Sequence, residues 1–166
     1  ARAVRLRLDP SAAVGFDDLY LGPVAASAAP QDVVLWRKDG LPAYQLAVTV
    51  DDHWQQVTTV VRGADLLEQT PVQRYLFDCL GTPAPRYAHL PILCGDDGRK
   101  LSKQNGAAAV DDDTPLENLR QVLHLLRQPA AEATATDVDA LLSAAAEDWQ
   151  PQRFAALGRE LSYAAP

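Results

Sequence analysis

Residues 58–93 read TTVVRGADLLEQTPVQRYLFDCLGTPAPRYAHLPIL, and this stretch decides the fold. It begins with a β-branched run at 58–62, which indicates a strand, and ends with an apolar run at 87–93, which indicates a second strand. The residues between the two runs have the signals of a helix. A strand, a helix and a strand in this order are typical of a parallel α/β sheet.

The helix inside this stretch has a start signal, an apolar face and a stop signal. Thr70 suits the N-cap, Pro71 suits the first helical position, and Gln73 completes a capping box. The apolar residues of the helix share one stripe and are Val72, Tyr75, Leu76, Cys79 and Leu80. A core position is therefore the simplest interpretation of Cys79. Gly81 suits the position just after the helix end.

Patterns on both sides extend this arrangement. Before the stretch we expect strands at 2–8 and 33–37, loops with short strands at 11–32, and a helix at 41–52. After it we expect a turn at 95–98, a loop at 99–106, helices at 114–127 and 136–149, and a last helix up to residue 161. A second capping box, at 114–117, opens the first of these helices. The sequence therefore predicts an α/β part followed by a small helical part.

Composition limits the class of protein. The chain has 166 residues, 48% of them hydrophobic, and a formal net charge of −7. A core can be buried at this size, whereas an acidic chain is a poor general binder of nucleic acid, because phosphate contacts need Lys and Arg. No apolar run approaches the roughly 18 residues of a membrane span, and no signal peptide opens the chain. We therefore expect a cytoplasmic protein that has no membrane partner.

The cysteines and the chain start carry two further expectations. Cys79 and Cys94 are too few for a disulfide framework and too far apart for a zinc knuckle, so we predict no metal site. The chain lacks Met and opens directly on an alternating, strand-like pattern. This opening indicates a chain that begins partway through a fold.

The first candidate for chemistry is the sequence KLSKQ at residues 100–104. Lys100 and Lys103 lie three residues apart on a glycine-flanked loop after a strand, where two ammonium groups can close over a polyphosphate. Phosphoryl and nucleotidyl transfer depend largely on such electrostatic stabilisation. A solvated basic loop is the alternative, because exposed Lys is common.

Arg62 is the second candidate. It ends a predicted strand, and ligands of open α/β sheets bind beyond the carboxyl ends of the strands. At that place a guanidinium can hold a carboxylate through two hydrogen bonds. A structural ion pair with Asp52 or Asp65 is the alternative.

Other side chains each allow a functional and a structural interpretation. Tyr44 either hydrogen-bonds a substrate group or packs as a core aromatic residue on an amphipathic helix. His89 lies at a strand end, where it either contacts a nucleotide or is a satisfied structural histidine. Asp51 and Asp52 either bind an amine or a metal or form a charged helix end.

Four segments occur in a specific order, namely DGLPAYQLAVTVDD at 39–52, VVRGADL at 60–66, HLP at 89–91 and KLSKQNGA at 100–107. Together they resemble the glutamyl-queuosine tRNA(Asp) synthetases, which are truncated paralogues of glutamyl-tRNA synthetase in class I. The resemblance covers nearly the whole chain and is firmest over 33–107. In ordinary glutamyl-tRNA synthetases Arg-His-Gly usually follows the second lysine, whereas Gln104, Asn105 and Gly106 follow it here.

The resemblance implies a fold and a reaction. The fold is α/β, the second half of a class I synthetase Rossmann-like catalytic domain, followed by a helical region similar to a stem-contact fold. The implied boundaries are 1–37 for the end of an inserted connective region, 38–106 for the catalytic half-domain with the lysine loop, and 107–166 for the helical region. The reaction is activation of glutamate by ATP, with Mg²⁺, and its transfer to queuosine in the anticodon of tRNA(Asp).

The resemblance also implies roles for individual residues. Tyr44 and Arg62 contact glutamate. His89, Ser102 and Lys103 bind ATP. Lys100 and Lys103 act in catalysis on a mobile loop at residues 100–104.

The chain departs from the family pattern in what it lacks. The family's N-terminal half holds the HIGH-type nucleotide motif, further glutamate contacts and a Cys-rich zinc site, and the sequence contains none of them. We therefore carry over no zinc ligand, expect the missing N-terminal half as a partner, and expect the chain alone to be inactive and the complete enzyme to be a monomer. Two alternatives stay open: a fragment of an ordinary glutamyl-tRNA synthetase, and a non-catalytic half that binds RNA or a partner protein.

Overall fold

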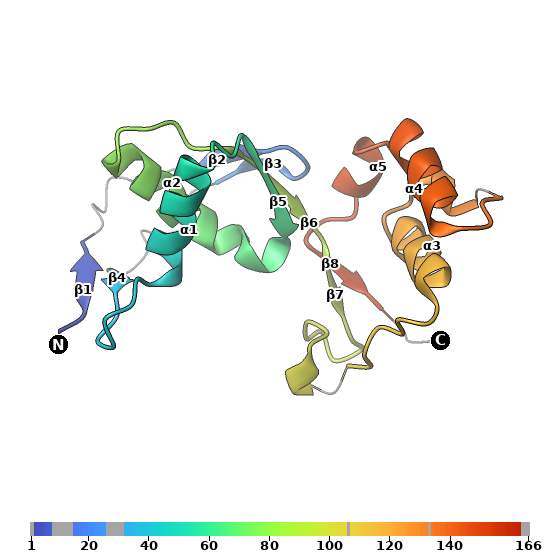
Figure 1. Cartoon of the computed structure of the whole chain (residues 1–166), viewed down its shortest axis with the longest axis horizontal. Helices are drawn as coiled ribbons and strands as arrows, with labels where there is room; N and C mark the ends of the chain where they lie inside the picture. Colours follow the sequence, from blue (N-terminus) through green and yellow to red (C-terminus); the bar gives the residue numbers. More distant parts are fainter. Residues whose placement is uncertain (1, 8–14, 26–31, 106, 133, 164–166) are drawn as a thin grey trace. The chain divides into compact units, whose positions relative to one another are not determined.

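The computed structural model describes residues 2–7, 15–25, 32–105, 107–132 and 134–163. The chain forms two compact units, Ala1–Leu90 and Pro91–Pro166. Figure 1 shows the elements of both units. In the described part of the chain, no helix has the length and apolar character that crossing a membrane requires.

The first unit is built on a mixed four-stranded sheet (Figure 1). Its strand order is β3 (Gly22–Val24), β2 (Phe16–Asp18), β6 (Arg86–Leu90) and β5 (Thr59–Gly63). Strands β5 and β6 are parallel along their whole length, with β5 at the edge of the sheet, whereas β2 is parallel to β6 and antiparallel to β3. The prediction of parallel strands on either side of a helix is confirmed.

The first unit has further strands and helices besides this sheet. They are the antiparallel pair β1 (Val4–Leu6) and β4 (Val33–Trp36), the helices α1 (Tyr44–Trp54) and α2 (Thr70–Cys79), and the 3₁₀ helix η1 (Ala64–Gln69). Helix α1 begins later than the predicted residue 41, because Pro42 still pairs with Trp36 in an isolated antiparallel bridge.

Two apolar clusters hold the first unit together. One joins α2 to the β1–β4 pair and consists of Val72 and Leu76 with Leu6, Val33, Leu35 and Tyr75. The other packs against the sheet and consists of Phe16, Leu67 and Tyr87 with Leu21, Val24 and Val60. Burial of such apolar side chains is the main favourable term in folding.

Two predictions for α2 are wrong. The 3₁₀ helix η1 runs directly into α2, so the N-cap position belongs to Gln69 and the Thr70 side chain makes no capping hydrogen bond. The buried face also differs from the predicted stripe, since it contains Gln73 and Phe77 while Cys79 is exposed. This rotated face is tolerated because the buried Gln73 amide has hydrogen-bond partners.

The second unit combines a short strand pair with helices. Its elements are β7 (Ile92–Cys94), η2 (Lys103–Asn105), α3 (Pro115–Leu125), η3 (Pro129–Glu132), α4 (Val138–Glu147), α5 (Gln152–Ala155) and β8 (Glu160–Ser162). Strands β7 and β8 are parallel. The helices bury Leu123, Ala130, Leu141 and Ala145 against Leu116, Leu119, Ala135 and Ala144.

Three further predictions are corrected here. The strand predicted at 87–93 is two strands separated by Pro91, which has no N–H to donate. The last helix ends at Ala155 and does not reach residue 161, because Gly158 adopts a left-handed φ of 74° and the chain then enters β8. Thr114 does occupy the N-cap of α3, but its hydroxyl donates to the carbonyl of Asp111 and caps no N–H of the helix.

Candidate active site

Arg62 is the centre of a polar network in the first unit. It lies near the end of β5, and its side chain is half-buried. Nε donates to Nε2 of His89 (3.1 Å), Nη1 to Oε1 of Gln73 (2.8 Å) and Nη2 to Oγ1 of Thr70 (2.7 Å). A longer contact of 3.4 Å joins Nη2 to the carbonyl of Leu66. Four of the five N–H groups of the guanidinium therefore have acceptors in the fold.

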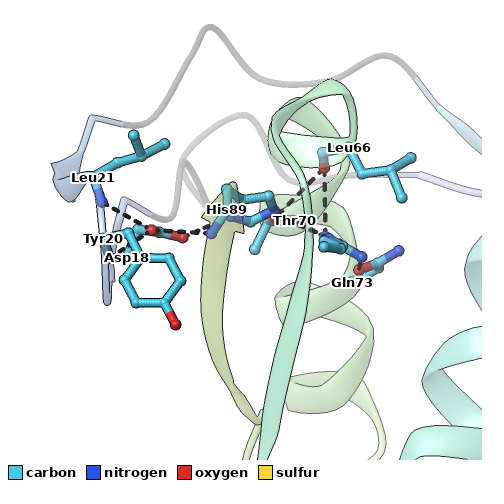
Figure 2. A network of polar contacts seen from close by, with 8 residues as sticks. Asp18, Tyr20, Leu21, Leu66, Thr70, Gln73 and His89 are labelled. Atoms are coloured by element: carbon cyan, nitrogen blue, oxygen red, sulfur yellow. Dashed lines mark hydrogen bonds and ion pairs between the residues drawn. The ribbon is translucent and has the colours of Figure 1, made fainter. Parts of the chain in front are cut away.

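The sheet register brings His89 beside Arg62, because the two residues are partners in the β5–β6 pair. The His89 side chain is fully buried. Because a guanidinium can only donate, Nε2 of His89 accepts the hydrogen bond and the proton of the ring lies on Nδ1. Nδ1 in turn lies 2.6 Å from Oδ2 of Asp18. In Figure 2, Asp18 lies on one side of His89 and Thr70 on the other.

Asp18 is a buried carboxylate with several donors. The backbone N–H groups of Tyr20, Leu21 and His89 donate to its Oδ1, at 2.9, 3.0 and 3.2 Å. Burial by itself raises the pKa of Asp18, but these hydrogen bonds and the one from the His89 ring outweigh burial, so the pKa is lowered from its ordinary value. The carboxylate is therefore charged at neutral pH and accepts from His89.

The acceptors that surround Arg62 are neutral. Burial lowers the pKa of Arg62, and the groups that act in the opposite direction are Tyr87, Tyr44, Asp52 and Asp65. Asp52 and Asp65 are the carboxylates that the sequence predicts as alternative ion-pair partners of Arg62. They interact with the guanidinium electrostatically, over a longer distance than its hydrogen bonds. A half-buried cation held by neutral acceptors favours an anionic ligand, because the fold has not neutralised it by direct contact.

Tyr87 forms the aromatic side of the network. The guanidinium carbon of Arg62 lies 5.1 Å from the centre of the Tyr87 ring, and the ring stacks on His89 with centroids 6.2 Å apart. Burial raises the pKa of Tyr87 to about 12. Its hydroxyl is buried and has no hydrogen-bond partner among the residues that the structure describes.

Tyr44 is the first residue of α1 and is 54% exposed. This exposure removes the core-aromatic interpretation and leaves the ring accessible to a ligand. The next residue, Gln45, ties the start of α1 to the network, because its Oε1 accepts from Nε2 of Gln73 at 2.9 Å. Its own Nε2 donates to Oε1 of Gln69 at 2.5 Å.

The lysine loop belongs to the second unit. Lys100 forms a bridge with Cys94, the N–H of Leu101 donates to the carbonyl of Leu93 at 2.8 Å, and η2 begins at Lys103. Both lysines are exposed, whereas Ser102 is half-buried. The loop is thus anchored to β7 at its start and presents its ammonium groups to solvent.

The structure brings some of the predicted site residues together and adds others. Arg62 and His89 are in direct contact, and Tyr44 acts on the same guanidinium. Sequence reasoning missed Asp18 and Gln45, for which no local pattern exists. The sequence predicts Thr70 and Gln73 as a capping box, whereas in the structure both side chains accept hydrogen bonds from Arg62. The assignments of Tyr44 and Arg62 to glutamate, and of His89, Ser102 and Lys103 to ATP, stay predictions.

The described residues contain no group of three or more His, Cys, Asp or Glu side chains that could hold a metal ion. Cys79 is exposed at the end of α2 in the first unit, and Cys94 is buried on β7 in the second.

Comparisons with known proteins give a consistent result. The family model described as tRNA synthetases class I (E and Q), catalytic domain, matches residues 1–129. A Glutamyl-Q tRNA(Asp) synthetase from Xanthomonas oryzae pv. oryzae is 51% identical over 154 residues, which cover 91% of this chain and 52% of that protein. A protein of the same name from Methylococcus capsulatus is 52% identical over 126 residues, which cover 75% of this chain and 41% of that protein. The chain thus spans about half the length of the curated relatives it matches, or less.

Two solved structures are similar in fold. A glutamate-tRNA synthetase from Elizabethkingia anophelis has a TM-score of 0.68 at 23% identity, covering 90% of this chain and 34% of that chain. A glutamate tRNA ligase from Elizabethkingia meningosepticum, in complex with its amino acid, has a TM-score of 0.64 at 22% identity, covering 89% of this chain and 33% of that chain.

Proposed function

Because this chain belongs to the class I tRNA synthetase family (E and Q), catalytic domain, we propose that it is part of an enzyme that activates glutamate with ATP and transfers it to queuosine in tRNA(Asp). The names of the relatives that are about half identical support this choice of substrates. Since the chain spans about half of their length, the activity is proposed for the complete protein.

The observation that carries the proposal is the state of Arg62. Its guanidinium is half-buried and charged, and its hydrogen-bonding partners are neutral. A carboxylate of glutamate would supply the missing negative charge and accept a charge-assisted hydrogen bond. Tyr44, exposed at the start of α1, would offer its hydroxyl to the same substrate.

The lysine loop would serve the nucleotide. In the activation step an oxygen of the glutamate α-carboxylate attacks the α-phosphorus of ATP, the bond to the β-phosphate breaks, and pyrophosphate leaves. Lys100, Ser102 and Lys103 would stabilise the negative charge that develops on the phosphate oxygens, with Mg²⁺ accompanying the ATP. In the transfer step a hydroxyl oxygen of queuosine attacks the acyl carbon, the bond between this carbon and the phosphate oxygen of AMP breaks, and the hydroxyl loses its proton.

His89 fits ATP less well than the other predicted residues do. Its side chain is fully buried, and both ring nitrogens are engaged by Asp18 and Arg62. We therefore place the role of His89 within the Arg62 network.

The remaining parts of the proposal concern organisation. We propose that 1–37 ends an inserted connective region, that 38–106 is the catalytic half-domain, and that 107–166 is a helical region similar to a stem-contact fold. The remainder of the enzyme would supply the opposite wall of the nucleotide pocket, and the complete enzyme would act as a monomer. We also propose a cytoplasmic location for the enzyme, in keeping with a tRNA substrate.

The direct test is ATP–pyrophosphate exchange by the complete protein with glutamate and without tRNA. We expect exchange in the wild type and a loss of roughly tenfold or more in Arg62→Ala and in Lys103→Ala, since each removes a charged contact. Arg86→Ala and Lys38→Ala are matched controls, because both side chains are exposed. An unchanged rate of exchange in Arg62→Ala and Lys103→Ala would contradict the assignment of Arg62 to glutamate and of Lys103 to ATP.

An ordinary glutamyl-tRNA synthetase is the second candidate, favoured by the fold of the two solved structures. Enzymatic removal of the 3′-terminal adenosine of the tRNA distinguishes the two activities. It should abolish attachment of glutamate to the 3′ end and spare attachment to queuosine. Glutamylation that stops after removal of this adenosine would favour the ordinary enzyme.

A further inference from the structure

We infer that His89, held in one tautomer by Asp18, is a positioning residue that orients Arg62 toward the substrate carboxylate. The inference rests on the proposed role of Arg62 in binding glutamate. It assigns a function to a buried pair, His89 and Asp18, whose side chains are both 0% exposed and touch no solvent.

The first step is the direction of the hydrogen bonds. Asp18 is ionised and can only accept, and Arg62 can only donate. The imidazole between them therefore donates from Nδ1 to Asp18, at 2.6 Å, and accepts at Nε2 from Arg62, at 3.1 Å. Oγ1 of Thr70 lies 3.2 Å from the same Nε2, and this hydroxyl can donate to it. A ring with two protons would turn an N–H toward the N–H of Arg62, and the opposite tautomer would do the same.

The second step is what this does to the guanidinium. His89 accepts from Nε and Thr70 accepts from Nη2, so the edge formed by these two nitrogens is turned toward the protein. Nη1 donates to Gln73 and retains its second N–H. A carboxylate would therefore meet Arg62 through its Nη1 end, and not through the side-on fork that His89 and Thr70 occupy.

The third step concerns Asp18. The carboxylate is fixed by the backbone N–H groups of Tyr20 and Leu21, so its second oxygen stays aimed at Nδ1 of His89 (Figure 2). In Asp18→Asn the amide oxygen can still serve the backbone, whereas the amide N–H₂ would face Nδ1. His89 would then carry its proton on Nε2 and point it at Arg62, so the guanidinium would lose its orientation.

The tautomer can be measured directly in the complete protein by ¹⁵N NMR of the histidine rings, with the His89 signal assigned from its absence in His89→Gln. We expect a protonated Nδ1 and an unprotonated Nε2 at neutral pH. A protonated Nε2 in the wild type would overturn the inference.

The kinetic test uses ATP–pyrophosphate exchange. In Asp18→Asn we expect the KM for glutamate to rise roughly tenfold or more, because a charged hydrogen-bonding group loses its partner, while the KM for ATP stays within about twofold. Asp17→Asn is the matched control, since Asp17 is the exposed neighbour on β2. Equal changes in both KM values, or no change in either, would contradict positioning.

A pair of substitutions at His89 separates its two hydrogen bonds. His89→Gln places an amide oxygen where Nε2 accepts from Arg62, whereas His89→Asn retains a donor toward Asp18 and does not reach Arg62. We expect His89→Gln to keep a KM for glutamate within a few-fold of the wild type and His89→Asn to raise it roughly tenfold or more. The reverse order, or equal values for the two variants, would refute the role of Nε2. If the wild type shows no glutamate-dependent exchange, the proposed function itself fails, which is a distinct result.

Discussion

Gln73 and Arg62 are joined by a hydrogen bond of 2.8 Å in which the amide oxygen of a nearly fully buried glutamine accepts from Nη1 of the guanidinium. Nη1 carries two N–H groups, and the amide oxygen accepts from one of them. The other N–H group remains for a ligand. The amide oxygen therefore occupies a place beside the one that a substrate carboxylate oxygen would take. The charge state of residue 73 should consequently decide how strongly Arg62 attracts an anion.

Gln73→Glu should convert this neighbour into a competitor of the substrate. A carboxylate at residue 73 would form a charge-assisted hydrogen bond with Arg62 and neutralise it from within the fold. We expect the KM for glutamate to rise roughly tenfold or more. The thermal stability should fall, because the buried amide N–H₂ that donates to Oε1 of Gln45 is replaced by a carboxylate oxygen. Gln55→Glu adds the same charge at an exposed position and should leave the KM unchanged. A KM for glutamate that is the same in both variants would contradict the role of Arg62.

Tyr87→Phe should remove a buried hydroxyl at little cost in stability. This hydroxyl has no hydrogen-bond partner among the described residues, so its burial is uncompensated by them. At neutral pH we expect the free energy of unfolding of Tyr87→Phe to equal that of the wild type or exceed it by up to about 1–3 kcal/mol. A loss of stability comparable to a broken buried hydrogen bond would show that the hydroxyl has a partner.

The same variant makes a prediction at high pH. The pKa of Tyr87 is raised in the folded chain from 10.0 to about 12, so the folded state keeps its proton where the unfolded state has lost it. The contribution of Tyr87 is therefore complete below pH 10 and is lost as the pH rises through about 12. Between these values we expect the wild type to lose stability relative to Tyr87→Phe in urea unfolding.

The sheet could be predicted from the sequence because its signals are local. The β-branched run before Arg62 and the apolar run after residue 86 each lie within one segment, and the helix between them forces a parallel crossover. Arg62 is predictable for the same reason, since a charged residue at the end of a β-branched run is a local signal. Two predicted elements are too long: the strand at 87–93 is interrupted at Pro91, and the last helix ends before Gly158.

The rest of the site could not be predicted because its partners are distant in sequence or share their chemistry with helix caps. Asp18 is 71 residues from His89, and it lies in a loop-rich segment without any periodic pattern. Thr70 and Gln73 have the residue types of a capping box, but the same oxygen atoms accept equally well from a guanidinium. Thr70 and Gln73 contact Arg62, and Thr70 does not cap α2, because η1 ends at Gln69 and this residue occupies the N-cap position of α2.

Acid should weaken the wild type through Asp18. The pKa of Asp18 is lower in the folded chain than its ordinary value of 3.8, so the folded state binds fewer protons at this carboxylate than the unfolded state does. Its contribution is present above the ordinary value and is lost as the pH falls through the folded value. We expect Asp18→Asn to be less stable than the wild type at pH 7, by about 1–3 kcal/mol, and the gap to narrow below about pH 4. A gap that stays constant down to pH 3 in urea unfolding would contradict this linkage.

Leu141→Ala should destabilise the helical cluster of the second unit. The Leu141 side chain is fully buried among Leu123, Ala130 and Ala145, so its truncation leaves a cavity as well as losing apolar burial. We expect a loss of about 2–4 kcal/mol in the free energy of unfolding, against less than about 1 kcal/mol for Leu142→Ala, whose side chain is 48% exposed. Urea unfolding followed by Trp149 fluorescence, in a background with Trp36→Phe and Trp54→Phe, reports on this unit, because Trp149 is its tryptophan and the other two lie in the first unit. Equal losses in the two leucine variants would show that the cluster around Leu141 is not the core of the helical unit.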